Sequence, residues 1–424
     1  MVVSRRLLAA VAALAALVAA GAALATHDQR GARFEVLGHV QPATGYSADV
    51  VLHRRHAFLS SHKGGASCPA AGVGVYSLRD PRRPRRIATF GRIPGTWTEK
   101  TIVQRVSTPA FTGDLAVTSV QSCRERAFRG FALYDVTRPG RPRELARVRT
   151  EPRGSHELWL QRVGRRAYVY TAIVASEILS STDGKPGEPD FRIYDVTRPR
   201  RPVLRGGWGA WRALGLVPFH DPNRRLEGNF VHSVVGDGAR AYLSYWDLGT
   251  VVLDVRDPAR PRYVGRTRAT ENAHSAWLGP RGLLIETHEA SGGVATLHRR
   301  AATGDPVQLS TFELPDSVIR RGHGVRGLAP VSGLDLTDSV HDAKLQGQTA
   351  LFSWYAQGVV AADVSDPSRP RFLARFLPRP DEDPERLLCP RSRCTAVWGV
   401  DVEGDLVVAS DMVSGLWILQ LRRD

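Results

Sequence analysis

Four histidines share a sequence context that suits metal coordination. Each begins a short apolar stretch and is followed by a small or acidic residue: His156-Glu157, His232-Ser233, His274-Ser275 and His341-Asp342. Neutral imidazoles bind copper and other divalent metals, and nearby carboxylates add oxygen ligands. The pattern predicts a metal site if the four stretches converge. The alternative is a repeated structural role, in which each imidazole bonds loop backbone.

Other polar and aromatic residues are predicted to lie on the same face as the four histidines and extend the candidate site. Two further histidines, at the ends of neighbouring stretches, are additional metal candidates: His62 and His288. The remaining candidates for contacting a ligand are Trp208, Trp211, Asp247, Glu286, Trp398 and Asp411. The segment 206–229 is too aromatic for a plain linker, so it predicts either a lid over the site or a small core under a loop.

The motifs of several enzyme classes are absent from the sequence. There is no Gly-x-x-x-x-Gly-Lys phosphate loop, no Gly-x-Ser-x-Gly elbow and no Cys-x-x-Cys pair. Scattered Ser, His and Asp residues are too common to define a triad. We therefore expect a binding or interaction module first. A metal-dependent oxidoreductase or hydrolase, using copper or another divalent ion, is the alternative.

The four cysteines favour disulfides if the chain is exported. Cys389 and Cys394 enclose a short loop and are expected to pair, which leaves Cys68 and Cys123 for each other. The alternative for any of them is a free or metal-bound thiol.

The elements that must position these residues belong to an internal repeat. Residues 134–142 (Tyr-Asp-Val-Thr-Arg-Pro-Gly-Arg-Pro) recur with small changes at 194–202, 253–261 and 362–370. A weaker copy covers 76–84, and a degenerate one surrounds Asp305-Pro306. The period is about 50 to 60 residues, which is long enough for one supersecondary unit.

Each period predicts four short antiparallel strands, the content of a β-propeller blade. An apolar strand leads through a turn to a second strand, and a β-branched third strand, such as 250–253, precedes the Asp-x-x-x-Pro turn. The Asp carboxylate is expected to bond N–H groups of that turn. The prolines and arginines then fall on the outermost strand, where they discourage edge pairing.

The two ends of the mature chain read as partial repeats. Residues 415–421 form a last apolar strand with no fourth strand after it, and residues 34–40 form a spare strand before the first repeat. These strands are expected to pair and close the ring, which removes free edges. The sequence predicts an all-β, seven-bladed β-propeller, with residues 26–424 as a single domain.

The blade motif resembles that of the LVIVD-repeat proteins, exported propellers whose strand-plus-Asp signature is matched by Val251-Val252-Leu253-Asp254-Val255. The resemblance covers nearly the whole mature chain and implies the fold and export, without an assigned activity. Selenium-binding proteins and methanethiol oxidases are also seven-bladed propellers, with histidines serving a copper centre. That similarity is architectural, because their adjacent His-His pair and Cys-x-x-Cys are absent here.

The N-terminus has the layout of a secretory signal over residues 1–25. Arg5 and Arg6 precede an Ala-rich run, and residues 23–25 (Ala-Leu-Ala) suit a signal peptidase. Residues 4–8 (Ser-Arg-Arg-Leu-Leu) also resemble a twin-arginine signal. A retained membrane anchor is the alternative. After cleavage we expect no membrane span, and a secreted or cell-envelope monomer.

The formal charge of +16 falls by two, to +14, once Arg5 and Arg6 are removed. Only four of the 58 basic residues are lysine, which indicates a general preference for arginine as much as a binding surface. An anionic polymer of the envelope is a candidate partner, whereas nucleic acid is not expected because export separates the protein from it.

The loops are predicted to be unequal on the two faces of the propeller. Loops between blades and between second and third strands share one face. That face collects the long insertions at about 174–190, 206–229, 315–339 and 377–395, all four cysteines and the four histidines. We expect the histidines to form an arc around the channel, with one side left open.

Overall fold

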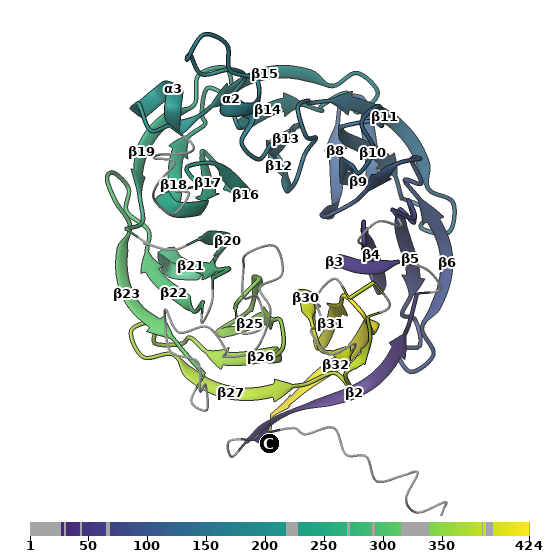
Figure 1. The fold of residues 1–424 in the computed structure, drawn as a ribbon. Helices are drawn as coiled ribbons and strands as arrows, with labels where there is room; N and C mark the ends of the chain where they lie inside the picture. Colours follow the sequence, from purple (N-terminus) through teal and green to yellow (C-terminus); the bar gives the residue numbers. More distant parts are fainter. Residues whose placement is uncertain are drawn as a thin grey trace, which may run out of the picture.

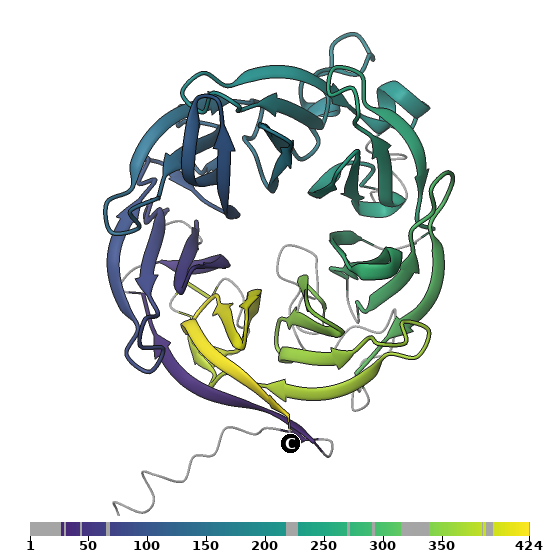
Figure 2. The same ribbon diagram turned by 180° about the vertical axis from the view of Figure 1, so that it is seen from behind.

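A computed structural model describes residues 27–28, 31–42, 45–64, 68–217, 228–268, 272–290, 293–314, 339–383, 385–386 and 393–423. These residues form a ring of seven antiparallel blades around a central channel (Figures 1 and 2). The predicted fold is therefore confirmed. The predicted signal, residues 1–25, lies outside the described residues. No helix in the described part of the chain is long and apolar enough to cross a membrane.

Strands occupy equivalent places in every blade, from the channel outward. The first strands are β3 (Tyr46–His53), β8 (Thr101–Thr108), β12 (Leu158–Val163), β16 (Val231–Asp237), β20 (Ala273–Leu278), β24 (Asp342–Gln346) and β30 (Val397–Glu403). The second strands are β4 (His56–His62), β9 (Phe111–Ser122), β13 (Arg166–Ala172), β17 (Arg240–Tyr245), β21 (Leu283–His288), β25 (Thr349–Trp354) and β31 (Leu406–Asp411). The seven first strands therefore surround the channel (Figure 1).

The outer half of each blade carries the repeat motif. The third strands are β5 (Val73–Ser77), β10 (Gly130–Asp135), β14 (Phe191–Asp195), β18 (Gly249–Asp254), β22 (Ala295–Arg299), β26 (Gly358–Asp363) and β32 (Gly415–Arg423). The fourth strands are β6 (Arg85–Phe90), β11 (Arg143–Arg149), β15 (Val203–Trp208), β19 (Arg262–Arg266), β23 (Val307–Phe312), β27 (Arg371–Phe376) and β2 (Ala32–Val40).

The ring closes as the partial repeats predict. The N-terminal strand β2 pairs antiparallel with the C-terminal strand β32, from Ala32 opposite Arg423 to Val40 opposite Leu416. The seventh blade thus combines β2 with β30, β31 and β32, and β2 and β32 lie side by side in Figure 1. Two short strands supplement the blades: β1 (His27–Asp28) pairs with β27, and β7 (Thr96–Trp97) pairs with β9.

The Asp of the Asp-x-x-x-Pro turn accepts backbone hydrogen bonds, as the sequence predicts. The Asp254 carboxylate accepts the Arg256 backbone N–H at 3.0 Å, and Asp135 accepts the Thr137 N–H at 3.1 Å. The same carboxylates pair with arginines, as Asp135 does with Arg143 at 2.9 Å. Several of the arginines therefore serve blade turns.

Apolar side chains fill the spaces between blades. One buried cluster joins the third and fourth blades through Tyr170, Phe191, Leu243 and Val251, and others repeat this arrangement around the ring. Each blade therefore buries its faces against its neighbours, which is why a closed ring of such repeats is stable.

One 3₁₀ turn, η2 (Pro280–Gly282), joins β20 to β21. The other irregular segments join blades, or second to third strands, on the opposite face, which holds the starts of the first strands. They include two short helices, α2 (Ser176–Leu179) and α3 (Ala210–Leu214), the 3₁₀ turn η1 (Trp246–Leu248), and the pair β28 (Asp381–Glu382) and β29 (Arg393–Cys394). The expected Cys68–Cys123 disulfide is present there, with Cα atoms 6.3 Å apart. Cys389, the predicted partner of Cys394, lies outside the described residues.

Candidate functional site

The four predicted histidines converge at one end of the channel. Ring centroids are 4.3 Å apart for His156 and His232, 4.2 Å for His232 and His274, and 4.1 Å for His274 and His341. Each imidazole sits at or just before the start of a first strand, in blades three to six. The repeat therefore places four copies of one position side by side around the channel axis.

Three aromatic side chains complete the circle, so the expected open side is closed. Ring centroids are 4.2 Å apart for His341 and Trp398, 5.6 Å for Trp398 and His62, and 4.6 Å for His62 and Trp97. Trp97 then lies 6.3 Å from His156. We call these seven residues the collar: His62, Trp97, His156, His232, His274, His341 and Trp398. Each blade contributes one member, and the expectation of an incomplete arc is wrong.

Hydrogen bonds set the orientation of several imidazoles. His274 Nδ1 lies 2.5 Å from the His341 carbonyl oxygen and donates to it, which leaves Nε2 as a lone-pair donor for a ligand. The Gln121 amide donates to His156 Nδ1 at 2.9 Å, and His156 Nε2 lies 2.8 Å from His232 Nε2. Gln121 thus fixes the His156 ring from outside the collar, and the other two contacts are made between collar members.

Other collar nitrogens have no hydrogen-bond partner among the described residues. They are His232 Nδ1 and both ring nitrogens of His341. His232, His274 and His341 are only 9%, 1% and 2% exposed. Buried polar atoms normally have partners, and a neutral imidazole has one N–H and one lone pair, so each of these two rings can still bond to a group that the polypeptide does not supply.

Glu289 adds a carboxylate to the collar. One oxygen lies 3.5 Å from His274 Nε2, and the other accepts a hydrogen bond from the Tyr355 hydroxyl. One atom from each of His232, His274 and Glu289 lies within 4.8 Å of the others. Two imidazoles and a carboxylate make a donor set that zinc, copper or nickel accepts.

Burial keeps the collar imidazoles in their ligating form. It lowers the pKa of His62 and of His156 to about 3, and the pKa values of the other three collar histidines well below the ordinary value. The imidazoles are therefore neutral at physiological pH. Burial also raises the pKa of Glu289 to about 7. A nearby cation would favour the ionised carboxylate.

A layer of buried charges lies directly beneath the collar. Lys100 Nζ lies 3.0 Å from Asp49, 3.1 Å from Asp342 and 3.6 Å from Glu157, and Lys344 donates to Asp342 at 2.5 Å. We call these five residues the charge layer. Three carboxylates and two ammonium groups give it a net charge of −1 when all are ionised.

The charge layer and the collar occupy successive sequence positions. Glu157 and Asp342 follow His156 and His341 directly, and Ser275 Oγ, which follows His274, donates to Asp342 at 3.1 Å. In the seventh blade this position is Gly399, where a Cβ would lie 2.4 Å from an Asp49 oxygen. A side chain there would displace Asp49 from Lys100.

Three predicted site residues form hydrogen bonds between strands, within a blade or between neighbouring blades, and are not part of the collar. Glu286 accepts hydrogen bonds from Thr250 and Thr267, and His288 Nε2 lies 3.3 Å from it. Asp411 accepts the backbone N–H groups of Ala396, Val413 and Ser414. The structure does not bring these three candidates into the collar, because their oxygens and nitrogens are used between strands.

The remaining ligand candidates lie in the loops above the blades. Trp208 is 6% exposed and packs on Tyr245. The backbone N–H of Trp211, in α3, donates to the Glu177 carboxylate. Of the two interpretations of this segment, its described part therefore resembles a small core under a loop. Asp247 accepts the Gly228 N–H.

Several residues of the site lie outside the sequence prediction. Trp97 precedes the first strand of its blade, and Glu289 and Tyr355 follow second strands, so no repeat position marks them. Lys100 could have been found from the sequence. It is one of four lysines in a chain rich in arginine, and it occupies the position of Glu157 in the next blade.

No protein-family model matches the chain, and no curated protein matches it either. Among solved structures it is similar to the computationally designed Ika8 protein, with a TM-score of 0.51 over 91% of this chain and 99% of that chain. The sequence identity is 7%, so the likeness concerns the fold alone. The resemblance to LVIVD-repeat proteins stays a prediction.

Proposed function

We propose that this protein is an exported binding propeller whose collar holds a divalent transition metal. The observation that carries the proposal is the convergence of His232, His274 and Glu289, each with one donor atom within 4.8 Å of the others. Metal–nitrogen bonds are ~2.0–2.1 Å long, so small side-chain movements bring all three donors to one ion. His156 and His341 flank these ligands, and His341 offers a further nitrogen.

The surroundings of the three donors support a metal in three ways. The unpartnered nitrogens of His232 and His341 would gain a partner by coordination. The Tyr355 hydroxyl and the His341 carbonyl oxygen hold Glu289 and His274 from behind, as outer groups do at metal sites. A dication bound by one carboxylate leaves a charge of +1, and the charge layer would offset it with a net −1 when all its groups are ionised, including Glu157, whose pKa is raised by burial to about 7.

Imidazole and carboxylate donors favour zinc, copper or nickel over calcium or magnesium, which prefer all-oxygen sites. The low exposure of His274 and His341 favours retention of the metal over turnover of a substrate. A metal-dependent oxidoreductase or hydrolase is therefore the second reading of the same site. The predicted signal supports export, and the Cys68–Cys123 disulfide is compatible with it.

Metal analysis of the purified full chain tests the proposal. We expect about one equivalent of zinc, copper or nickel after growth in supplemented medium, and loss of most of it in His274→Ala and Glu289→Gln. His56→Gln, on the opposite face, and His298→Asn, a buried histidine outside the collar, should keep the metal. Circular dichroism and thermal melting verify that each variant folds.

The opposite outcome has a clear signature. A well-folded protein without metal, even after incubation with each of the three ions, would make the collar a purely structural plug of stacked rings. Equal metal loss in His298→Asn would mean that metal content merely reports folding.

A further inference from the structure

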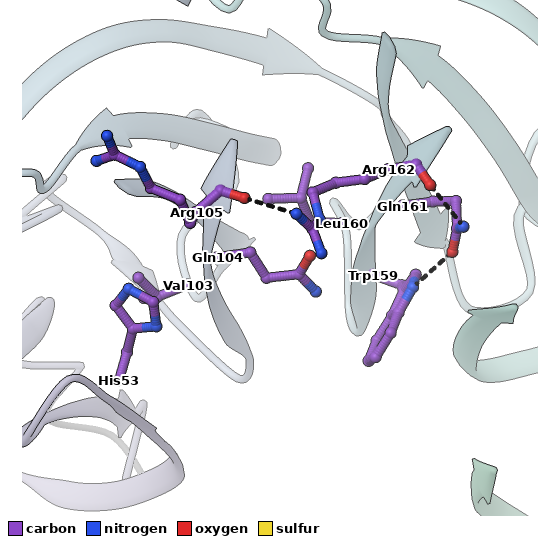
Figure 3. Close-up of a pocket in the computed structure, with 8 residues that line it drawn as sticks. All are labelled: His53, Val103, Gln104, Arg105, Trp159, Leu160, Gln161 and Arg162. Carbon is purple, nitrogen blue, oxygen red and sulfur yellow. Dashed lines mark hydrogen bonds between the residues drawn. The ribbon is translucent and has the colours of Figure 1, made fainter. Parts of the chain in front are cut away.

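The end of the channel farthest from the collar carries a second, chemically different site. The mouth pocket, with a volume of about 400 Å³, lies against the far ends of β3, β8 and β12. Its lining residues are His53, Val103, Gln104, Arg105, Trp159, Leu160, Gln161 and Arg162 (Figure 3). Arg162 lies six positions after His156, or about 20 Å along an extended strand, so the rim of the pocket is remote from the collar, whereas its deepest wall at Trp159 lies three positions, or about 10 Å, from it.

Basic groups outnumber acidic ones at this pocket. The Asp114 carboxylate pairs with several of them. It lies 3.1 Å from Arg54 Nη1, 3.8 Å from Arg105 Nη1 and 3.3 Å from His53 Nε2. Arg162 donates to a neutral acceptor, the Arg105 carbonyl oxygen, at 3.2 Å. The pocket lining itself holds two guanidinium groups, Arg105 and Arg162, and no carboxylate, so a local positive charge remains that attracts an anion.

The arginines are held at the rim and not buried. The side chain of Arg105 is 44% exposed, and the Arg162–Arg105 bond ties two neighbouring first strands together at the pocket edge. Exposed guanidinium groups with spare N–H donors recognise carboxylate and phosphate oxygens, often with two parallel bonds. An anion at the rim would therefore meet the Arg162 guanidinium, which a hydrogen bond already positions, and the exposed Arg105 guanidinium beside it.

The wall of the pocket offers a different kind of contact. The Trp159 indole N–H donates to Gln161 Oε1 at 3.0 Å, and the Gln161 amide donates to the Arg162 carbonyl oxygen at 3.1 Å, which fixes both side chains. The Gln104 amide points into the space between Trp159 and the Arg162 guanidinium (Figure 3). An aromatic face beside amide donors and acceptors suits a ring that carries hydroxyl groups.

We propose that the mouth pocket binds a sugar ring bearing a carboxylate or phosphate group. The anion would bond to Arg162 and Arg105 at the rim, while the ring would lie against Trp159 with its hydroxyl groups near Gln104. The pocket volume falls within the roughly 300–1,000 Å³ of small-molecule sites. The proposal is independent of the metal proposal, because no residue is shared between the two sites.

Calorimetric titration of the full chain at low ionic strength tests this proposal with three probes. Glucuronic acid carries a carboxylate, glucose 6-phosphate carries a phosphate, and glucose carries neither. We expect the two charged sugars to bind and glucose to bind at least about ten-fold more weakly, since one charge-assisted contact accounts for a factor of that size. The ratio of the two charged probes identifies the preferred anion.

Two variants and a matched control locate the binding. Arg162→Gln and Gln104→Glu should each weaken the charged sugars about ten-fold or more, the second by placing a carboxylate in the pocket. Arg165→Gln removes the same charge from the adjacent turn, outside the pocket, and should change affinity less than about two-fold. Metal content of all three variants should equal that of the parent chain.

Three results would overturn the proposal. Equal weakening in Arg165→Gln would indicate a diffuse electrostatic effect of the arginine-rich face. Glucose binding as tightly as its charged relatives would exclude an anion site. Absence of heat and of any thermal shift with all three probes at high millimolar concentration would exclude a sugar site.

Discussion

The two ends of the channel are built from the same strands, but charged side chains are buried and paired at one end and exposed to solvent at the other. At the collar end, Lys100 is enclosed by Asp49, Glu157 and Asp342, and its side chain is 9% exposed. At the mouth, Arg105 shares one carboxylate with other basic groups and is 44% exposed. A buried charge depends on its partners, whereas an exposed one is solvated by water. The collar end is thus suited to holding an ion, and the mouth to meeting a ligand.

The largest expected effect is on stability and separates the two ends directly. Lys100→Met should lower the free energy of unfolding by about 3–5 kcal/mol, because it leaves buried carboxylates without their cation. Arg105→Met, at the mouth, should cost less than about 1 kcal/mol. Urea denaturation followed by circular dichroism measures both. A cost below 1 kcal/mol for the lysine variant would contradict the idea of a tightly coupled charge layer.

A bound metal should stabilise the folded protein through the collar end alone. At a free metal concentration 100 times its Kd, the gain in unfolding free energy is about 2.7 kcal/mol. His274→Ala should abolish this gain, and Arg162→Gln should leave it intact. Thermal melts with and without metal provide the measurement, and a gain that survives His274→Ala would place the ion elsewhere.

The pH dependence of stability should also differ between the buried carboxyl groups of the collar face and the exposed turns. Burial raises the pKa of Asp190 to about 8, so the folded protein keeps this proton up to about that pH while the unfolded chain loses it near ~3.9. The folded state then binds more protons, and stability falls as pH rises from about 4 to 8.

Asp190→Asn should flatten that fall by a few kcal/mol, because each pKa unit corresponds to about 1.4 kcal/mol. Asparagine keeps an acceptor for the Glu177 N–H, so the fold should persist. Unfolding free energies at pH 5 and pH 8 test this. An unchanged slope in the variant would show that Asp190 is ionised in the folded protein.

The smallest effect belongs to the exposed turns of the repeat. A hydrogen bond from Arg256 lowers the pKa of Asp254 to about 2, so its contribution is present at neutral pH and is lost as pH falls from about 4 towards 2. Asp254→Asn keeps an acceptor for the turn N–H and should cost only about 0.5 kcal/mol at pH 7. Chemical denaturation at pH 7 and pH 3 tests both statements. A cost above 2 kcal/mol would make this turn as important as the charge layer.

Much of the collar could be predicted because a repeat copies positions. His156, His232, His274 and His341 occupy one repeat position, and equivalent positions around a closed ring must lie at similar distances from the axis. Trp97 could not be found in this way, because it lies in β7, before the first strand of its blade. Glu289 and Tyr355 come from segments after second strands, where the repeats differ in length.

The sequence by itself determined the blade, its Asp-x-x-x-Pro turn and the closure of the ring by β2 and β32. These depend on local hydrogen bonds and on a strand period that can be read along the chain. Only the tertiary structure decided that Lys100 meets Asp342, 242 residues later, and that the collar has no gap. Contacts between blades depend on the radius of the closed ring and on which loops turn inward. Neither is encoded in any single repeat.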